Sequence, residues 1–325
     1  MVTAKKKRKK KRPKQRKKGR QWLVFCVVAV LFASLGGLVV FLALSPDDAT
    51  VLPKIGEVDG NGPTISYEET YVVPEPVIVA QPVKKSQVVP VSPDVTPEDG
   101  GLVAKRERPL VAIVIDDMGY NKKNCEALLD LDLDLSFAFL PFGPYTEHQA
   151  SRAHRLGRDV LLHFPMEASD PKWKPGRGTI AIAMDSPEIR RIFVENLAAV
   201  PYASGINNHM GSRFTQNNQS MQDFMEAMQE SGLFFLDSRT SRNSVGYSLA
   251  KKMAVRTAER DIFLDNVRDP QKIIIQLRKL VDVARRQGFA IAIGHPYPET
   301  LQALKEYKRE ILQQVKVVGV GTLVR

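Results

Sequence analysis

Residues 109 to 325 alternate between short apolar segments and longer segments with helical spacing, and this alternation limits the fold more than any other feature of the chain. Strands that alternate with helices form a parallel sheet, in which each helix serves as the crossover. Seven or eight such units predict an α/β fold, a (β/α) barrel of about seven strands. The expected strands are 110–115, 135–140, 159–163, 205–207, 233–237, 262–265, 290–294 and 315–320, and the expected helices lie near 121–130, 146–157, 187–199, 220–231, 270–287 and 298–313.

Polar residues occur at the ends of these expected strands. Two aspartates follow the first strand, a histidine ends the third, and histidines follow the fourth and the seventh. Because all strand carboxyl ends of a parallel barrel lie on one face, we expect these side chains to converge on one site. The residues concerned are Asp116, Asp117, His163, His209, Asp237, Asp265 and His295.

The adjacent pair Asp116 and Asp117 needs a compensating positive charge, since neighbouring carboxylates repel each other. Carboxylates and imidazoles without a cysteine suit a borderline divalent ion such as zinc in an open catalytic site. Beside such an ion, one aspartate can act as a ligand and the other as a base. Alternatively, each histidine is an ordinary hydrogen-bonded residue at a strand end.

The N-terminus is strongly basic. The first twenty residues contain 13 of the 47 Lys and Arg and no acidic residue, which leaves 34 basic against 36 acidic residues in the rest of the chain. Residues 22–44 contain no charge and are long enough to cross a hydrocarbon core of about 30 Å. A basic cluster beside a first span keeps that end in the cytoplasm. We therefore expect a cytoplasmic tail (1–21) that binds no nucleic acid and a single transmembrane anchor (22–44), with a cleaved signal peptide as the alternative.

Residues 45–108 are rich in proline, with nine of the 21 prolines of the chain. A segment of this composition buries too little apolar surface to offset its ordering entropy, so we expect a disordered linker. Docking of a partner on its proline-rich stretches is the alternative. The linker would hold the domain 109–325 away from the membrane, on the outer side of it.

Six motifs of this domain occur in order: VAIVIDDMGYN, VLLHFPMEA, GINNHMGSRFT, FFLDSRTS, DIFLDNVRD and AIAIGHPYPETL. Together they resemble the divergent polysaccharide deacetylases, a bacterial envelope branch of the carbohydrate esterase and polysaccharide deacetylase superfamily. The resemblance covers essentially all of 109–325. It implies a distorted (β/α) barrel and metal-dependent removal of acetyl groups from an acetylated envelope glycan. Together with the expected anchor, an envelope protein of this kind is expected to carry its domain on the periplasmic side of the bacterial inner membrane.

Position by position, the resemblance implies that Asp116 is the catalytic base, Asp117 a metal ligand and His295 the general acid. In such a reaction the metal polarises the acetyl carbonyl and acidifies water, Asp116 accepts a proton, and His295 protonates the leaving amine. His295 stands in the sequence IGHPYP, which differs from the usual setting of the superfamily's acid.

Two motifs depart from the superfamily pattern. A pair of histidines four residues apart corresponds here to His163 and Glu167, so either Glu167 or His209 is the third ligand of the metal, most simply zinc. The arginine motif expected on the fourth strand is replaced by NNHMGS, which removes a substrate-positioning arginine. This loss makes a noncatalytic module that binds a glycan or an envelope protein the alternative to a hydrolase.

Five further residues are candidates for supporting roles. Asn207 and Asn208 either stabilise an oxyanion or cap a turn. Asp237 and Arg239 either orient a histidine, which we favour, or form a salt bridge at the rim. Tyr297, beside His295, is a candidate for stacking on a sugar ring. The sequence does not specify the oligomeric state.

Overall fold

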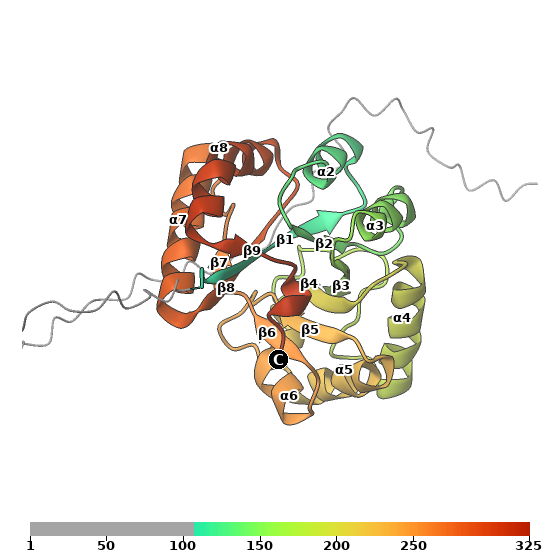
Figure 1. Cartoon of the computed structure of the whole chain (residues 1–325). Coiled ribbons are helices and arrows are strands. Elements are labelled where there is room, and N and C mark those ends of the chain that lie inside the picture. Colours follow the sequence, from blue (N-terminus) through green and yellow to red (C-terminus); the bar gives the residue numbers. More distant parts are fainter. Residues whose placement is uncertain (1–106) are drawn as a thin grey trace, which may run out of the picture. The chain divides into compact units, whose positions relative to one another are not determined.

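The computed structural model describes residues 107–325 (Figure 1). The expected tail, the expected membrane span and almost all of the expected linker lie outside the described residues. Within the described range, no helix combines the length and the apolar composition needed to cross a membrane.

The described strands form one parallel sheet that curls on itself. Their order is β6-β5-β4-β3-β2-β1-β8-β7, and β9 pairs with the beginning of β1. The strands are β1 (Leu110–Met118), β2 (Ser136–Phe139), β3 (Val160–Met166), β4 (Gly205–Met210), β5 (Phe234–Asp237), β6 (Thr257–Glu259), β7 (Ile262–Phe263), β8 (Phe289–Gly294) and β9 (Lys316–Val317).

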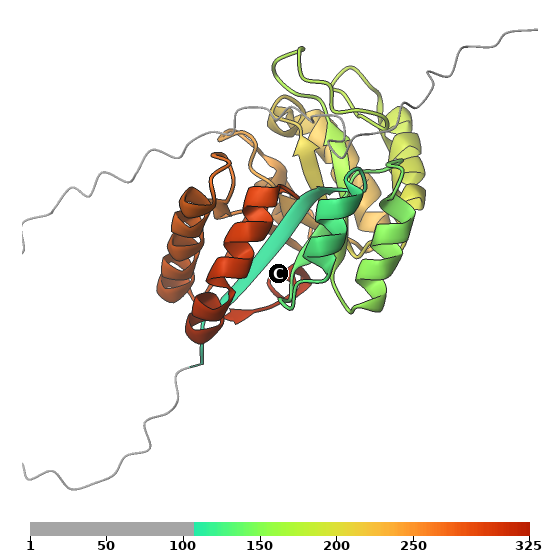
Figure 2. The same ribbon diagram turned by 90° about the horizontal axis from the view of Figure 1, so that it is seen from above.

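The helices lie around the outside of the curled sheet, as Figures 1 and 2 show. Local signals set where they begin: Asp185 and Glu188 form a capping box at the start of α4, and Asp269 caps α7, which begins with Pro270. The helices are α2 (Lys122–Leu129), α3 (Thr146–Arg155), α4 (Ser186–Ala199), α5 (Asn218–Ser231), α6 (Gly246–Lys252), α7 (Pro270–Gln287) and α8 (Pro298–Gln314).

One short connection joins the two ends of the sheet. β6 ends at Glu259 and β7 begins at Ile262, so three Cα steps keep the sheet ends within about 11 Å of each other. The N–H of Arg260 donates to the carbonyl of Asp237 at the end of β5 (3.0 Å), and the N–H of Asp261 donates to the carbonyl of Ile291 in β8 (2.9 Å). The curled parallel sheet therefore fits the predicted distorted barrel, with β6 and β7 as two parts of one interrupted strand.

Two apolar clusters occupy the two faces of the sheet. Along β1, Val111, Ile113 and Ile115 belong to the outer cluster beneath the helices, whereas Ala112 and Val114 belong to the inner one. This division follows from the strand period of two, which sends alternate side chains to opposite faces. The beginning of β1 is therefore apolar on both faces, because both faces are buried there.

The C-terminal segment covers the inner cluster at the amino edge of the sheet. Val318, Val320, Leu323 and Val324 are buried against inner-facing strand residues. The N–H of Val320 donates to Ser136 Oγ (2.9 Å), and the N–H of Gly321 donates to Asp159 Oδ2 (2.7 Å). Ser136 begins β2 and Asp159 immediately precedes β3, so the segment closes the end of the barrel where these strands start.

Most expected elements are confirmed, with small shifts at their ends. Two elements, α6 and β6, were not expected from the sequence, and β6 is only three residues long and mostly polar. The last expected strand, 315–320, is wrong beyond Val317: the chain turns beneath the inner cluster and forms a short 3-10 helix, Val320–Thr322, instead.

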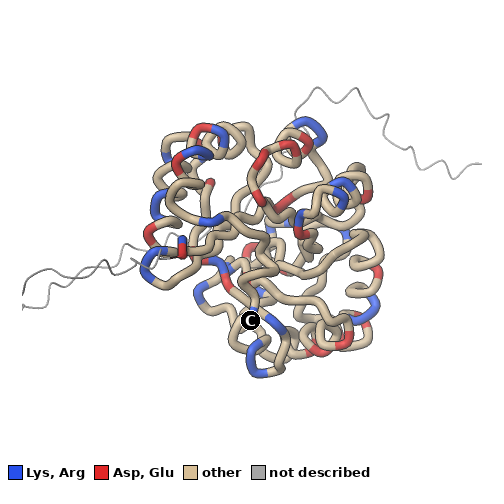
Figure 3. The backbone as a smooth tube through the Cα atoms, viewed as in Figure 1, with Lys and Arg blue, Asp and Glu red and all other residues tan. Residues whose placement is uncertain are grey.

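Surface charges are mixed in sign. Figure 3 shows Lys and Arg interspersed with Asp and Glu over the outer helices. Exposed pairs such as Arg191 with Glu195 (2.7 Å) contribute at most about 1 kcal/mol each. The folded part is therefore nearly balanced in charge, as its sequence indicates.

Candidate metal centre

The inner face of the sheet changes from apolar to polar toward the carboxyl ends of the strands. On β1 the inner row runs Ala112, Val114 and then Asp116. On β3, His163 follows the inner-facing Leu161 by two residues, and the same spacing extends β8 to His295. Strand periodicity therefore directs these side chains into the barrel mouth, together with Asn207 and His209 of β4.

Asp117 reaches the same site through a backbone irregularity. Directly after Asp116, its side chain would point to the outer face of a regular strand. The register between β1 and β2 shifts between Ile115 and Met118, and Asp117 has φ 53°. Aspartate tolerates this left-handed conformation better than most residues. As a result both carboxylates face His163: Nε2 lies 3.6 Å from Asp116 Oδ2 and 3.2 Å from Asp117 Oδ1.

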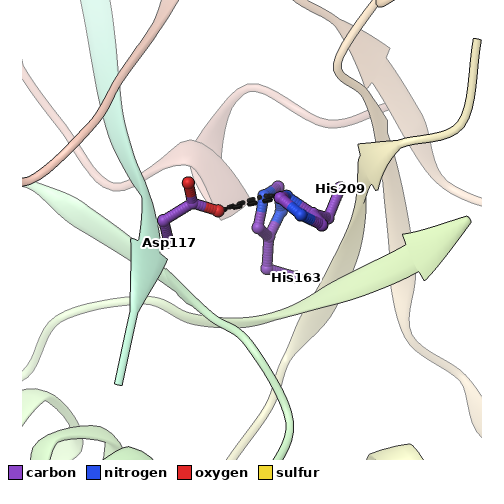
Figure 4. A group of neighbouring side chains, drawn as sticks. All are labelled: Asp117, His163 and His209. Carbon is purple, nitrogen blue, oxygen red and sulfur yellow. Dashed lines mark hydrogen bonds and ion pairs between the residues drawn. The ribbon is translucent and has the colours of Figure 1, made fainter. Parts of the chain in front are cut away.

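Asp117, His163 and His209 form a compact triangle of potential ligand atoms (Figure 4). Asp117 Oδ1 lies 3.2 Å from His163 Nε2 and 3.1 Å from His209 Nδ1, and the two nitrogens are 3.1 Å apart. Ligand atoms about 2.0–2.1 Å from a tetrahedral zinc ion are separated by about 3.3 Å. Asp117 Oδ2 is buried without a hydrogen-bond partner among the described residues, and the buried Oδ1 faces the nitrogens of His163 and His209. The residues present therefore fit a divalent metal.

Asn207 fixes the orientation and the tautomer of His163. Its Nδ2 donates to Asp116 Oδ1 (2.8 Å) and to Ser238 Oγ (3.2 Å). Its Oδ1 must then accept from His163 Nδ1, which lies 2.9 Å away. With the proton on Nδ1, the neutral imidazole directs the lone pair of Nε2 toward Asp117 and His209, as a metal ligand requires.

The two aspartates have different protonation behaviour. Burial raises the pKa of Asp116, against the opposing effect of His163. Burial acts in the same direction on Asp117, but the neighbouring imidazoles of His209 and His163 outweigh it and hold the pKa of Asp117 well below its usual range. Asp117 thus stays ionised, as a ligand must, whereas Asp116 has the higher proton affinity of the two, as a base needs.

His295 belongs to a second hydrogen-bonded group at the mouth. Its Nδ1 lies 2.9 Å from Asp265 Oδ1, and its backbone N–H donates to Asp265 Oδ2 (2.6 Å). Thr300 donates to the same oxygen (2.6 Å). Burial disfavours the imidazolium, yet the Asp265 carboxylate raises the pKa of His295 to about 9. His295 is therefore held as a protonated, oriented donor at neutral pH.

Glu167 lies apart from the ligand triangle. Its Oε1 pairs with Arg213 (3.0 Å) and its Oε2 accepts the N–H of Ile182 (2.8 Å). Arg213 lines a groove of about 360 Å³ together with Ser169, Ile182, Gln216 and Asn217. Of the two alternatives for a third ligand, the geometry favours His209, and Glu167 instead stabilises the wall of this groove.

Asp237 orients no histidine among the described residues, which corrects the role favoured from the sequence. Its Oδ1 accepts the N–H of Arg239 (2.8 Å), and its Oδ2 accepts from Ser244 Oγ (2.7 Å) and from the N–H of Tyr247 (3.0 Å). Asp237 lies two residues after Phe235, whose side chain belongs to the outer cluster. Because side chains alternate along a strand, Asp237 also points outward, away from the mouth. Arg239 forms a rim ion pair with Glu259 (3.4 Å).

Asn208 and Tyr297 contact other residues at the rim of the barrel mouth. Asn208 accepts the N–H of Ser238 (2.9 Å) and donates to the carbonyl of Met210 (2.8 Å), so it joins the loops after β4 and β5. The Tyr297 ring lies 5.6 Å from the His295 ring and beneath the guanidinium of Arg268 (3.8 Å). It is thus placed beside the candidate acid.

Asn207 was expected to stabilise an oxyanion or cap a turn, not to hold Asp116 and His163, and no role was expected for Arg260. Asp265 was recognised only as a residue at a strand end. Its spacing of two from the inner-facing Phe263 was the signal that it lies on the same face as His295. Nothing in the sequence indicates that the Asn207 amide bridges Asp116 and His163.

Comparison with known proteins identifies the class to which this fold and site belong. The family model described as "Divergent polysaccharide deacetylase" matches residues 113–324. The chain therefore belongs to the divergent polysaccharide deacetylase family.

Three relatives illustrate the match. The uncharacterized protein YibQ of Escherichia coli is 38% identical over 213 residues, which span 66% of this chain and 66% of that protein. An uncharacterized protein of Haemophilus influenzae is 38% identical over 215 residues, spanning 66% of this chain and 76% of that protein. The crystal structure of the uncharacterized protein ATU2773 from Agrobacterium tumefaciens is similar with a TM-score of 0.65 and 26% identity, covering 70% of this chain and 92% of that one.

Proposed function

We propose that this protein is a membrane-anchored, zinc-dependent deacetylase that acts on an acetylated envelope glycan. The observation that carries the proposal is the triangle of Asp117, His163 and His209 beside a separate candidate base, Asp116. Family membership supports the reaction class. The basic tail and the charge-free segment 22–44 support anchoring in the bacterial inner membrane, with the domain on the periplasmic side.

The proposed roles follow from the atoms at the mouth. Asp117 Oδ1, His163 Nε2 and His209 Nδ1 would hold the metal. When bound, a zinc ion supplies Lewis acidity toward the acetyl carbonyl and toward water. Asp116, held by Asn207, accepts a proton from the attacking water. His295, held protonated by Asp265, donates a proton to the leaving amine. The activation barrier is therefore lowered by acid and base groups that are held in position before the substrate binds.

A noncatalytic glycan-binding module is the second candidate. The observation that favours it is the sequence Asn207-Asn208-His209 on β4, which carries no arginine at the position where a substrate-positioning arginine is expected. Such a module would retain the groove beside Arg213 and bind acetylated glycan without releasing acetate.

Metal content and acetate release distinguish these possibilities. The full chain, purified in mild detergent, is expected to bind about one zinc ion, measured by mass spectrometry of the metal. His163→Ala and His209→Ala are expected to lose it, whereas the matched control Glu167→Gln keeps it. Acetate release from N-acetylated glycans should depend on that zinc. Zinc binding without acetate release from a broad glycan panel would favour the binding module, and the absence of zinc from the wild type contradicts the proposal.

The topology is tested separately. Protease added to spheroplasts is expected to degrade the domain, while an epitope placed in the basic tail becomes accessible only after the membrane is opened. An epitope on the tail that is accessible in intact spheroplasts contradicts the proposed orientation.

A further inference from the structure

The strongest unassigned feature at the barrel mouth is the side chain of Arg260. It lies in the short connection between β6 and β7, at the second position after the inner-facing Ala258. Its Cζ lies 5.3 Å from the ring of Phe263, and that ring lies 5.2 Å from the ring of His295. The Phe263 ring thus lies against both the Arg260 guanidinium and the ring of the candidate acid.

The guanidinium of Arg260 is fixed by backbone carbonyls. Nε donates to the carbonyl of Ser238 (2.8 Å) and Nη2 donates to the carbonyl of Arg239 (3.0 Å). Ser238 Oγ in turn accepts from Asn207, which holds Asp116. The guanidinium is therefore tied to the candidate base by a short chain of hydrogen bonds, and little side-chain entropy remains to be lost when it binds a ligand.

One edge of this guanidinium has no described partner. The two carbonyls occupy the edge formed by Nε and Nη2, and no described residue accepts a hydrogen bond from Nη1 or forms an ion pair with Arg260. The edge formed by Nη1 and Nη2 matches the two oxygens of a carboxylate or phosphate. Burial lowers the pKa of Arg260 to about 10, so the group is still charged at neutral pH.

We propose that Arg260 is a specificity-determining residue that binds an oxyanion, a carboxylate or a phosphate, on the glycan held at the metal centre. The inference rests on the proposed function for its substrate class, and it restricts that class to acidic acetylated glycans. A hydroxyl of a neutral sugar does not require a fixed, partly buried charge, whereas an oxyanion is neutralised by one. Arg239, whose charge is paired with Glu259 at the rim, has no such role.

Binding measurements test the proposal independently of turnover. The full chain in mild detergent is titrated calorimetrically with neutral N-acetylchitotetraose and with an acidic tetrasaccharide of hyaluronan. N-acetylglucosamine and its 6-phosphate form a second pair, which separates phosphate from carboxylate recognition. A charge-assisted pair predicts at least about tenfold tighter binding of one acidic probe than of its neutral counterpart, and this preference should weaken with salt.

Substitutions assign the preference to one side chain. Arg260→Gln is expected to abolish it while changing the affinity for the neutral probe less than about threefold, and the matched control Arg239→Gln is expected to keep it. Arg260→Lys retains the charge but cannot form a bidentate pair with an oxyanion, so it should retain only part of the preference for acidic probes. Thermal unfolding of each variant verifies that it is folded.

Each outcome decides the proposal. Equal binding of neutral and acidic probes, no binding of either acidic probe, or a preference that survives in Arg260→Gln overturns it. Acetate release from neutral glycans without any acidic preference would overturn this inference and leave the deacetylase proposal intact. An acidic preference without acetate release would support the inference and favour the binding module.

Discussion

The lower and upper layers of the barrel interior use the same strands but opposite chemistry. In the lower layer, Ala112, Val114, Leu161, Ile291 and Ile293 pack against the C-terminal segment. Two residues further along the same strands, the upper layer places buried ionisable groups at the mouth: Asp116, His163 and His295. The apolar contacts of the interior thus belong to the lower layer.

This difference indicates which layer stabilises the fold and which performs the chemistry. Burial of apolar side chains contributes about 1.5–3 kcal/mol for each large one. Buried charges contribute little net stability and are costly when unpaired. The polar layer, with two adjacent carboxylates and a strained Asp117, is therefore explained by function rather than by stability.

Removal of residues 318–325 should have the largest effect. It exposes the lower layer and loses the burial of Val318, Val320, Leu323 and Val324. At about 1.5–3 kcal/mol each, the loss of about 6–12 kcal/mol is comparable to the whole stability of an ordinary domain. We expect no cooperative urea unfolding transition of the truncated chain by circular dichroism. Leu312→Ala, at an exposed position, should shift the transition only slightly; a native-like transition of the truncated chain would contradict this account.

Asp116→Asn should have the next largest effect, and only on activity. Loss of a general base lowers the rate by about 10²–10⁴-fold. Because Asp116 lies outside the ligand triangle, zinc content should be unchanged. Acetate release and metal content measured on the same preparation give the comparison. A variant that loses zinc would instead make Asp116 a ligand.

The pair Leu161→Ala and His163→Ala compares the two layers on one strand and one face. Leu161→Ala leaves a cavity in the lower layer, so the free energy of unfolding should fall by about 2–5 kcal/mol while zinc binding is retained. His163→Ala should lose zinc, because a ligand atom is removed. Urea unfolding in chelator and zinc content are measured for both variants. Loss of zinc from a folded Leu161→Ala would show that the layers are coupled.

Asp265→Asn should produce the smallest effect, a change in pH dependence. His295 must be protonated to act as an acid, so activity should fall as pH rises through its pKa of about 9. Without the Asp265 carboxylate this pKa falls, and the alkaline limb should move to lower pH by about one unit or more, equivalent to about 1.4 kcal/mol. The pH profile of kcat/KM measures the shift. An unchanged limb would mean that another group controls it.

The sequence predicted the architecture because apolar runs record burial directly. The segments 110–115 and 290–294 have no polar residue, and both became central strands with two buried faces. It failed where tertiary contacts supply the order: β6 contains the polar residues Thr257 and Glu259 and gains its pairing from β5 and the C-terminal segment. Short polar strands carry no periodic signal of their own.

The candidate site was predicted in part for the same reason. Placement at strand ends brought Asp116, His163 and His209 to one face, as expected. The same reasoning misplaced Asp237, because it ignored the parity that directs this side chain to the outer face. Conversely, strand alternation alone would place the Asp117 side chain on the outer face. Asp117 enters the site only through the register shift in β1.

The sequence by itself determined which segments become strands and helices and which strands end in ionisable residues, because these properties depend on local periodicity and composition. Only the tertiary structure decided which of those residues come into contact with one another. The bulge at Asp117, the amide bridge of Asn207 and the fixed guanidinium of Arg260 each depend on backbone positions distant in sequence. Contacts between such positions follow from the curvature of the whole sheet, which no local pattern encodes.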